Sequence, residues 1–447
     1  MAAVKSLWLC VLALPAAPAS ADTLANGADG FDLSGTIRLR YEAISNQSRA
    51  GLRRDDGFAS LRTTLAARYT SGGFTAFAEL WDSRVYAEKS NSALSTGEVN
   101  TIEPVQAYVA WKGKNGDTRL AVQAGRFMLN LGSRRLIAAD DYRNTTNGYT
   151  GLKLDIGAAR GWNATAIYVL PQQRRPDDLA SLHDNRVAFD HEGFDEVLWG
   201  GMVAKARAVG PVTAEAAFYH FGERDQPGRP TRDRSIDNYD LRLIRDPAIG
   251  KWDGEFELVY QGGSISTSAV ANAPRQGVAA WMLHASAGFS IPGKLKLHLS
   301  AQYDRASGDS AGGRYTHFDT LFGMRRAEFG PAGLYNAITR SNISSPGIRV
   351  EVAPSPRWDA FVTYRAFWLA DRTDAFATTG VRDPAGRSGA FAGHQLDARL
   401  RWWLRPDRYR FELDGAILAK GRFLDDAPNA TAGHATAYGS VNLSANF

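Results

Sequence analysis

The sequence predicts an all-β fold, a transmembrane antiparallel β-barrel of about eighteen strands with short periplasmic turns and long extracellular loops. Three observations support this prediction. Segments of alternating polar and apolar residues recur along the chain, tight turns alternate with long polar segments, and no apolar run is long enough for a membrane-spanning helix. The expected location is therefore the bacterial outer membrane.

The first 21 residues have the pattern of a secretory signal peptide. Lys5 precedes the apolar run Leu7–Leu14, and Ala19-Ser20-Ala21 provides a cleavage site. We expect cleavage after Ala21, followed by a short periplasmic segment, 22–34, and by the barrel, 35–447. The single cysteine, Cys10, lies in the signal, so the mature chain has no disulfide and no thiolate metal site.

The first predicted strand is Thr36–Ala43, in which Ile37, Leu39 and Tyr41 alternate with charged residues. The second strand, Leu61–Tyr69, shows the same alternation. Because a strand sends successive side chains to opposite faces, one face meets lipid and the other meets the lumen.

The predicted joints between strands alternate in length, which is typical of outer-membrane barrels. The tight turns lie at 71–73, 113–117, 157–161, 209–211, 246–251, 292–293, 353–357 and 405–407. The long polar segments lie at 82–103, 127–147, 171–196, 222–235, 263–277, 305–344, 371–393 and 421–435. Since segment 305–344 is the longest of these, we expect it to fold inward and narrow the pore.

One late strand has the length of a membrane crossing. Trp358 and Trp368 share a parity with Ala360, Val362, Tyr364 and Ala366 between them. Ten residues at about 3.3 Å, tilted by about 40°, span roughly 25 Å, and the two tryptophans fit the aromatic girdles at the interfaces. A strand of a soluble β-sandwich is the alternative, but such proteins seldom alternate short and long joints throughout.

The last three strands, 395–402, 408–417 and 440–447, repeat the alternation and end on Phe447. A terminal aromatic residue is common in outer-membrane barrels, so we expect the barrel-insertion machinery to bind this strand. Outer-membrane lipid is the other expected partner.

The inward parity carries many charges, and a barrel of about eighteen strands is wide enough for an aqueous channel. The predicted pore-lining residues are Arg38, Arg40, Arg62, Arg68, Arg365, Arg399, Arg401, Arg410, Glu42, Asp397 and Glu412. Lys296, Glu255 and Glu257 are also expected to point inward. Inward arginines favour anions, and the acids keep the expected preference modest.

Composition and motifs exclude other functions only in part. A net charge of +5 with interspersed signs gives no basic run for nucleic acid. His183-Asp184 and His191-Glu192 lie in an expected outer loop, which leaves an outer-membrane hydrolase as one alternative and a surface adhesin as another. No serine nucleophile motif and no D-x-D-x-D-G calcium loop is present, so we predict no catalytic residues, metal or cofactor.

Several segments resemble the alginate export family of outer-membrane porins. They are Glu103–Val109, Leu120–Arg126, Gly132–Leu136, Tyr303 through Gly308-Asp309 to Phe367-Trp368, Gln395–Asp397 and Gly421–Phe423. The resemblance implies a monomeric eighteen-stranded barrel whose arginine-rich pore passes an anionic or polar saccharide, and it adds Arg126 to the pore-lining set. The family's alginate exporter has a long periplasmic turn before its penultimate strand, whereas Leu404–Arg408 makes only a tight turn here.

Overall fold

The computed structural model describes residues 29–447 except 141, 227, 311, 325 and 332. The predicted signal peptide, 1–21, lies outside the described residues. The strands are β1 (Gly30–Ser45), β2 (Asp56–Ser71), β3 (Phe74–Tyr86), β4 (Asn100–Asn115), β5 (Thr118–Phe127), β6 (Tyr149–Ala158), β7 (Trp162–Pro171), β8 (Glu196–Val209), β9 (Val212–Glu223), β10 (Ser235–Arg245), β11 (Trp252–Ser266), β12 (Arg275–Ser290), β13 (His298–Ala306), β14 (Arg314–Tyr315), β15 (Ile343–Ser355), β16 (Trp358–Trp368), β17 (Phe391–Arg405), β18 (Tyr409–Lys420) and β19 (Ala435–Asn446).

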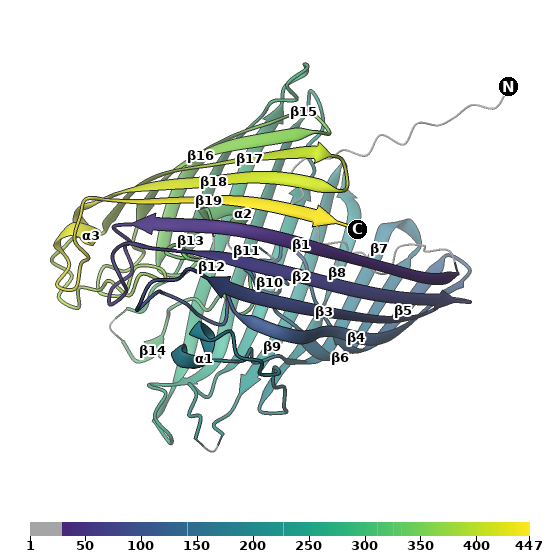
Figure 1. Ribbon diagram of the computed structural model, residues 1–447, viewed down its shortest axis with the longest axis horizontal. Coiled ribbons are helices and arrows are strands. Elements are labelled where there is room, and N and C mark those ends of the chain that lie inside the picture. The colour runs from purple at the N-terminus through teal and green to yellow at the C-terminus, as the bar shows by residue number, and fades with distance from the viewer. Residues whose placement is uncertain (1–28, 141, 227, 311, 325, 332) are drawn as a thin grey trace.

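These strands close into one barrel. Apart from β14, which pairs parallel with β12, each pairs antiparallel with the strands before and after it, and β1 closes the circle by pairing with β19, as in Leu39 opposite Leu443. Figure 1 shows these two strands side by side, purple against yellow. The two-residue β14 belongs to a loop, so among the described residues the nineteen-stranded sheet contains eighteen barrel strands. The predicted fold class is confirmed.

Helical segments are short in the described part of the chain: α1 (Leu179–His183), α2 (Arg326–Phe329), α3 (Arg422–Asp426) and the 3₁₀ turn η1 (Ala159–Gly161). Within the described ranges, no helix has both the length and the apolar character to cross a membrane.

The alternation of joints is also confirmed. The turn between β17 and β18 covers only 406–408, whereas the loop between β13 and β15 runs from 307 to 342. The first strand starts at Gly30, which pairs with Thr70, so residues 30–34 of the expected periplasmic segment belong to the barrel sheet. Lys296 was wrongly placed on a strand: it lies exposed in the turn before β13, at φ 45°.

The lipid-facing parity is exposed along the barrel. On β16, Trp358, Val362, Tyr364 and Trp368 have 36–45% of their surface exposed. Ala366 shares their parity but is 6% exposed, at the outer end of the strand. The opposite parity faces the lumen, which positions the functional side chains.

Candidate functional site

The loop between β5 and β6, residues 128–148, folds into the outer half of the barrel and is held there by arginines of the wall. Arg38 donates from Nη1 to the Tyr142 carbonyl at 3.1 Å and from Nη2 to the Arg143 carbonyl at 2.6 Å. Arg62 Nη1 donates to the same Arg143 carbonyl at 3.3 Å. These wall arginines therefore bind the loop backbone.

The long loop between β13 and β15, residues 307–342, also lies in the lumen, as the sequence predicted. The backbone N–H of Leu334 donates to Glu42 on β1 at 3.0 Å, and that of Asp319 donates to Gln261 on β11 at 2.9 Å. Contacts with strands on different sides of the barrel place this loop across its interior. We call loops 128–148 and 307–342 the plug loops.

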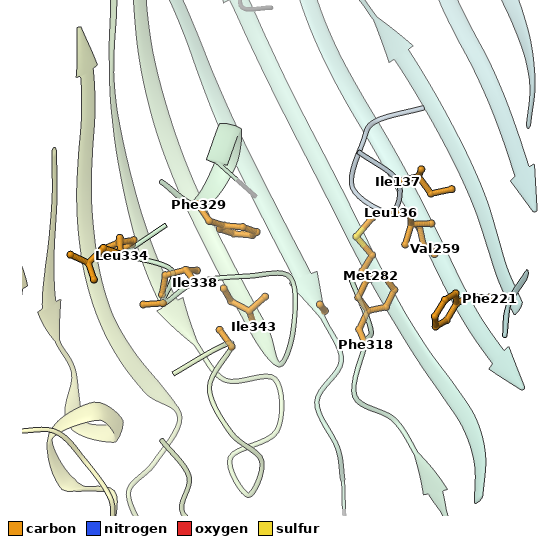
Figure 2. Close-up of a cluster of buried hydrophobic side chains, with 14 of the residues drawn as sticks. Leu136, Ile137, Phe221, Val259, Met282, Phe318, Phe329, Leu334, Ile338 and Ile343 are labelled. Carbon is orange, nitrogen blue, oxygen red and sulfur yellow. The ribbon is translucent and has the colours of Figure 1, made fainter. Parts of the chain in front are cut away.

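Apolar side chains of the plug loops pack against one another and against the wall (Figure 2). Leu136 and Ile137 of one loop and Phe318 of the other are each at most 4% exposed, beside Val259 and Met282 of the wall. Complete burial of such a side chain contributes about 1.5–3 kcal/mol. The plug loops are therefore a packed part of the barrel interior.

A buried ion cluster links the two plug loops to β11. Arg135 is 3% exposed and pairs with Glu255 and Glu257 of β11 and with Glu328 of the other plug loop. Glu255 also accepts from Arg242 Nε at 2.6 Å. Glu328 also pairs with Arg340, so Glu257 is the carboxylate of this cluster that depends most on Arg135 for charge compensation.

The inner half of the barrel, toward the short turns, contains an open cavity of about 460 Å³. Arg62 lies over the Trp81 ring with its guanidinium carbon 4.3 Å from the ring centroid. The charged residues that line this inner cavity are Arg38, Arg62, Arg68, Arg408, Arg410, Glu79 and Asp407.

Three other predicted pore residues are bound to wall acids. Arg365 is fully buried, and its Nη1 lies 2.9 Å from Asp304 Oδ2. Arg401 and Arg399 both approach Asp359, at 2.8 and 3.6 Å. These arginines face inward, and each has an acid beside it.

The remaining predicted residues of this wall face inward as well. The Arg40 guanidinium lies 4.0 Å from the centroid of the Tyr142 ring and 4.0 Å from Glu42. Asp397 accepts from Gln395 at 3.2 Å, and Glu412 lies 3.6 Å from Arg410. Most of these charges hold plug loops or neighbouring wall residues.

Arg126 requires a correction, because the structure does not place it with the inward residues. It shares the parity of Val122, which is 37% exposed, at the outer end of β5. Its Nη2 pairs with Glu192 of the next outer loop at 2.6 Å, and its Nη1 pairs with Glu103. Arg126 therefore fastens an outer loop to the rim of the barrel.

The histidines considered from sequence do not form a catalytic site with one another. His183 Nδ1 lies 3.4 Å from Glu88 Oε1, and the His191 backbone pairs with that of Gln173. A different histidine, His317, contacts both Ser341 Oγ and Asp374 Oδ2.

This Ser341–His317–Asp374 arrangement joins one plug loop to the loop between β16 and β17. The Ser341 side chain is buried, and its Oγ also lies 3.2 Å from the Phe318 carbonyl oxygen. We therefore interpret it as a polar clamp between loops.

One group of side chains has the composition of a cation site. Ligand atoms of His284, Asp304 and Glu328 all lie within 4.8 Å of one another. However, Asp304 pairs with Arg365, and Glu328 pairs with Arg135. Because positive side chains already occupy these carboxylates, the group is better suited to wall structure than to metal binding.

Sequence reasoning missed the inward course of loop 128–148 and the role of Arg135. The available signal was the density of apolar residues in this loop, including Leu129, Leu131, Leu136 and Ile137, which is unusual for a segment in water. The Gly132–Leu136 run was singled out only because of the resemblance.

Comparisons with known proteins agree with this architecture. The family model described as alginate export matches residues 30–438. No curated protein matches the chain in sequence. The BenF-like porin from Pseudomonas fluorescens Pf-5 has a similar structure, with a TM-score of 0.59, 12% identity and coverage of 93% of this chain and 98% of that one.

Two further similar structures come from Pseudomonas aeruginosa. OpdK, solved with vanillate, gives a TM-score of 0.57 at 13% identity, covering 94% of this chain and 100% of its own. OccK2 (OpdF), in complex with glucuronate, gives 0.56 at 13% identity, covering 93% and 96%. At these identities the likeness establishes the fold.

Proposed function

The chain belongs to the alginate export family and is a channel of the bacterial outer membrane, and from this premise we propose that it passes an anionic or polar saccharide along an arginine-lined wall. The observation that carries the proposal is the charge of the inner cavity. Five arginines and two acids line it, drawn from the first three strands, from β18 and from the turn between β17 and β18. In a confined lumen, an excess of positive charge attracts anions more strongly than it would in open water.

The chemistry of the lining suits an acidic sugar. A guanidinium presents paired N–H donors that match a carboxylate, and it remains charged at any physiological pH. Trp81, Trp403 and Phe77 line the same cavity and offer flat apolar faces beside the arginines. OccK2 and OpdK were solved with carboxylates, but the proposal for this chain rests on its own side chains.

Arg68 and Arg410 provide the sharpest test, because both line the inner cavity and they lie on β2 and β18, on either side of the seam between β1 and β19. We expect the wild-type channel to prefer chloride modestly over potassium in a potassium chloride gradient. The variant Arg68→Ser/Arg410→Ser should move the zero-current potential toward cation preference, and added salt should weaken the difference.

Leu400→Val is the matched control, since Leu400 faces lipid with 37% exposure. It should leave the zero-current potential unchanged. A wild-type channel that already prefers potassium, or arginine variants that behave like the control, would refute the arginine-lined channel.

The proposed partners follow from the same barrel. Lipid would contact the exposed apolar parity, and the insertion machinery would bind the last strand. Phe447 continues that strand by exchanging backbone hydrogen bonds with Gly35 at 2.9 and 3.0 Å. We propose a monomer, because the eighteen strands of the described chain close the barrel.

A further inference from the structure

A second cavity, of about 340 Å³, opens between the outer loops. We call it the outer cavity. Five loops contribute to its lining, those that follow β3, β5, β7, β9 and β13. The inner cavity, which carries the proposed function, shares no lining residue with it. The side chains that line the outer cavity include Gln172, Arg174, Arg175, Arg143, Asn147 and Arg229.

Arg174 is the central cation of the outer cavity. Its Nε donates to the Thr96 carbonyl at 2.9 Å, and its Nη1 donates to the Thr146 carbonyl at 3.1 Å and to Asn147 Oδ1 at 2.6 Å. All three acceptors are neutral, and no carboxylate of the described residues forms an ion pair with Arg174. Burial, together with Arg143, lowers the pKa of Arg174 to about 10.

Two more donors lack partners in this cavity. The Gln172 side chain is 9% exposed, and its Nε2 has no hydrogen-bond partner. Arg229 Nη1 is also buried without a partner. An unsatisfied buried donor costs about 1–3 kcal/mol, so a ligand acceptor placed here would recover that free energy.

The acids of the outer cavity are already compensated by other arginines. Asp140 lies 3.0 Å from Arg143, Glu196 lies 3.8 Å from Arg229, and Asp177 pairs with Arg175. Two acceptors, Asp140 Oδ1 and Gln173 Oε1, also lack a hydrogen-bond partner. However, four arginines against three acids give the lining an excess of positive charge, which suits a ligand with negative charge.

We propose that the outer cavity is a docking site for the carboxylate of an acidic sugar arriving from outside the cell, with Arg174 and Gln172 Nε2 as its donors. That the ligand is a sugar rests on the proposed function, whereas its carboxylate is inferred from the donors that line the outer cavity. Docking here would concentrate the ligand at the outer mouth before it reaches the plug loops.

Glucuronate is the probe, titrated by calorimetry into the full-length protein in detergent, with glucose as the uncharged comparison. We expect saturable binding of glucuronate and none of glucose. Gln172→Glu keeps the shape of the side chain but replaces the Nε2 donor with negative charge, and it should weaken glucuronate binding at least tenfold. The matched control is Arg186→Met, an exposed arginine of the same loop that does not line the cavity.

Arg174→Met should also weaken binding at least tenfold, although it removes three contacts between loops. Gln172→Glu keeps the test decisive if that variant misfolds. Wild-type protein that fails to bind glucuronate, or a Gln172→Glu variant that binds as tightly as wild type, overturns the proposal.

Failure here is distinguishable from failure of the proposed function. Gln172→Glu should leave the zero-current potential unchanged, and it should weaken glucuronate binding by the same factor in the Arg68→Ser/Arg410→Ser background as in wild-type protein. If Gln172→Glu shifts the zero-current potential, or if its effect on glucuronate binding disappears in the Arg68→Ser/Arg410→Ser background, the two cavities act as one site and the separate docking site is overturned.

Discussion

Replacing Arg135 with methionine should release the plug loop 128–148 from the barrel wall. Glu255 would keep Arg242 as a partner and Glu328 would keep Arg340, but Glu257 would lose the only guanidinium among its ion pairs in the described residues. Removing one member of a buried ion pair costs about 3–5 kcal/mol. At about 1.4 kcal/mol per factor of ten, this corresponds to at least a hundredfold increase in the population of the released loop.

Amide hydrogen exchange measures this population directly. The Asn147 N–H donates to the Ala139 carbonyl at 2.9 Å, and the Leu131 N–H donates to the Ile137 carbonyl at 3.2 Å, so both amides are protected while the loop is docked. We expect them to exchange at least a hundredfold faster in Arg135→Met. Single-channel conductance in planar bilayers should rise as well, because the loop fills the lumen.

The control is the double variant Arg135→Met/Glu257→Gln, which removes the stranded charge of Glu257 together with the arginine and leaves the Glu328–Arg340 pair intact. Because neutral buried groups of similar shape cost far less than unpaired charges, it should recover most of the protection. Unchanged exchange in the single variant would refute the reasoning, and so would equal acceleration in the single and double variants.

Deleting residues 308–342 should raise single-channel conductance without preventing insertion, and unchanged conductance would mean that this loop does not restrict the lumen. Asp190 lies in the loop between β7 and β8, residues 172–195, where burial, aided by Glu103, raises its pKa to about 7. In the docked loop Asp190 therefore holds a proton that it would lose near pH 4 in an exposed loop. The free energy that docks loop 172–195 should therefore fall by about 1.4 kcal/mol per pH unit from about pH 4 to 7. Hydrogen exchange in this loop, corrected for intrinsic rates, should become faster over the same range, and Asp190→Asn should abolish this pH dependence. Gly125→Ala should lower the free energy of unfolding by about 1–3 kcal/mol, because φ of Gly125 is 126° and the new Cβ would lie 2.4 Å from the Ala107 carbonyl oxygen. Gly415→Ala is the control: no backbone atom lies closer than 3.8 Å to its new Cβ, so its effect should be close to neutral.

The barrel was predictable from sequence because lipid imposes a regular pattern on it. Strands that cross a membrane must alternate their faces and join through turns of two distinct lengths, and both rules are visible in the residues. The same alternation also predicts which face of the barrel Arg126 lies on. Val122, Ala124 and Arg126 share the outward parity, although the resemblance assigned Arg126 to the pore.

The course of the plug loops was only partly predictable, since loops have no periodicity that fixes their direction. Length alone pointed to 307–342. Loop 128–148 is held through the carbonyl oxygens of Tyr142 and Arg143. Because every residue has a backbone carbonyl, the amino-acid sequence does not reveal which carbonyls will accept these hydrogen bonds. Its donors, Arg38 and Arg62, were found as inward residues, but their task of holding a loop depends on contacts between segments far apart in the chain.

The barrel closes where β1 pairs with β19. Among its strand pairs, this one cannot form until β19 has been made. Ribosomes make β1 before β19, so β1 exposes an unpaired edge until β19 has been made and exported. Such an edge is a template for aggregation with other chains. Cells that make this protein must therefore shield it in transit, and truncation within 435–447 would leave the edge permanently exposed.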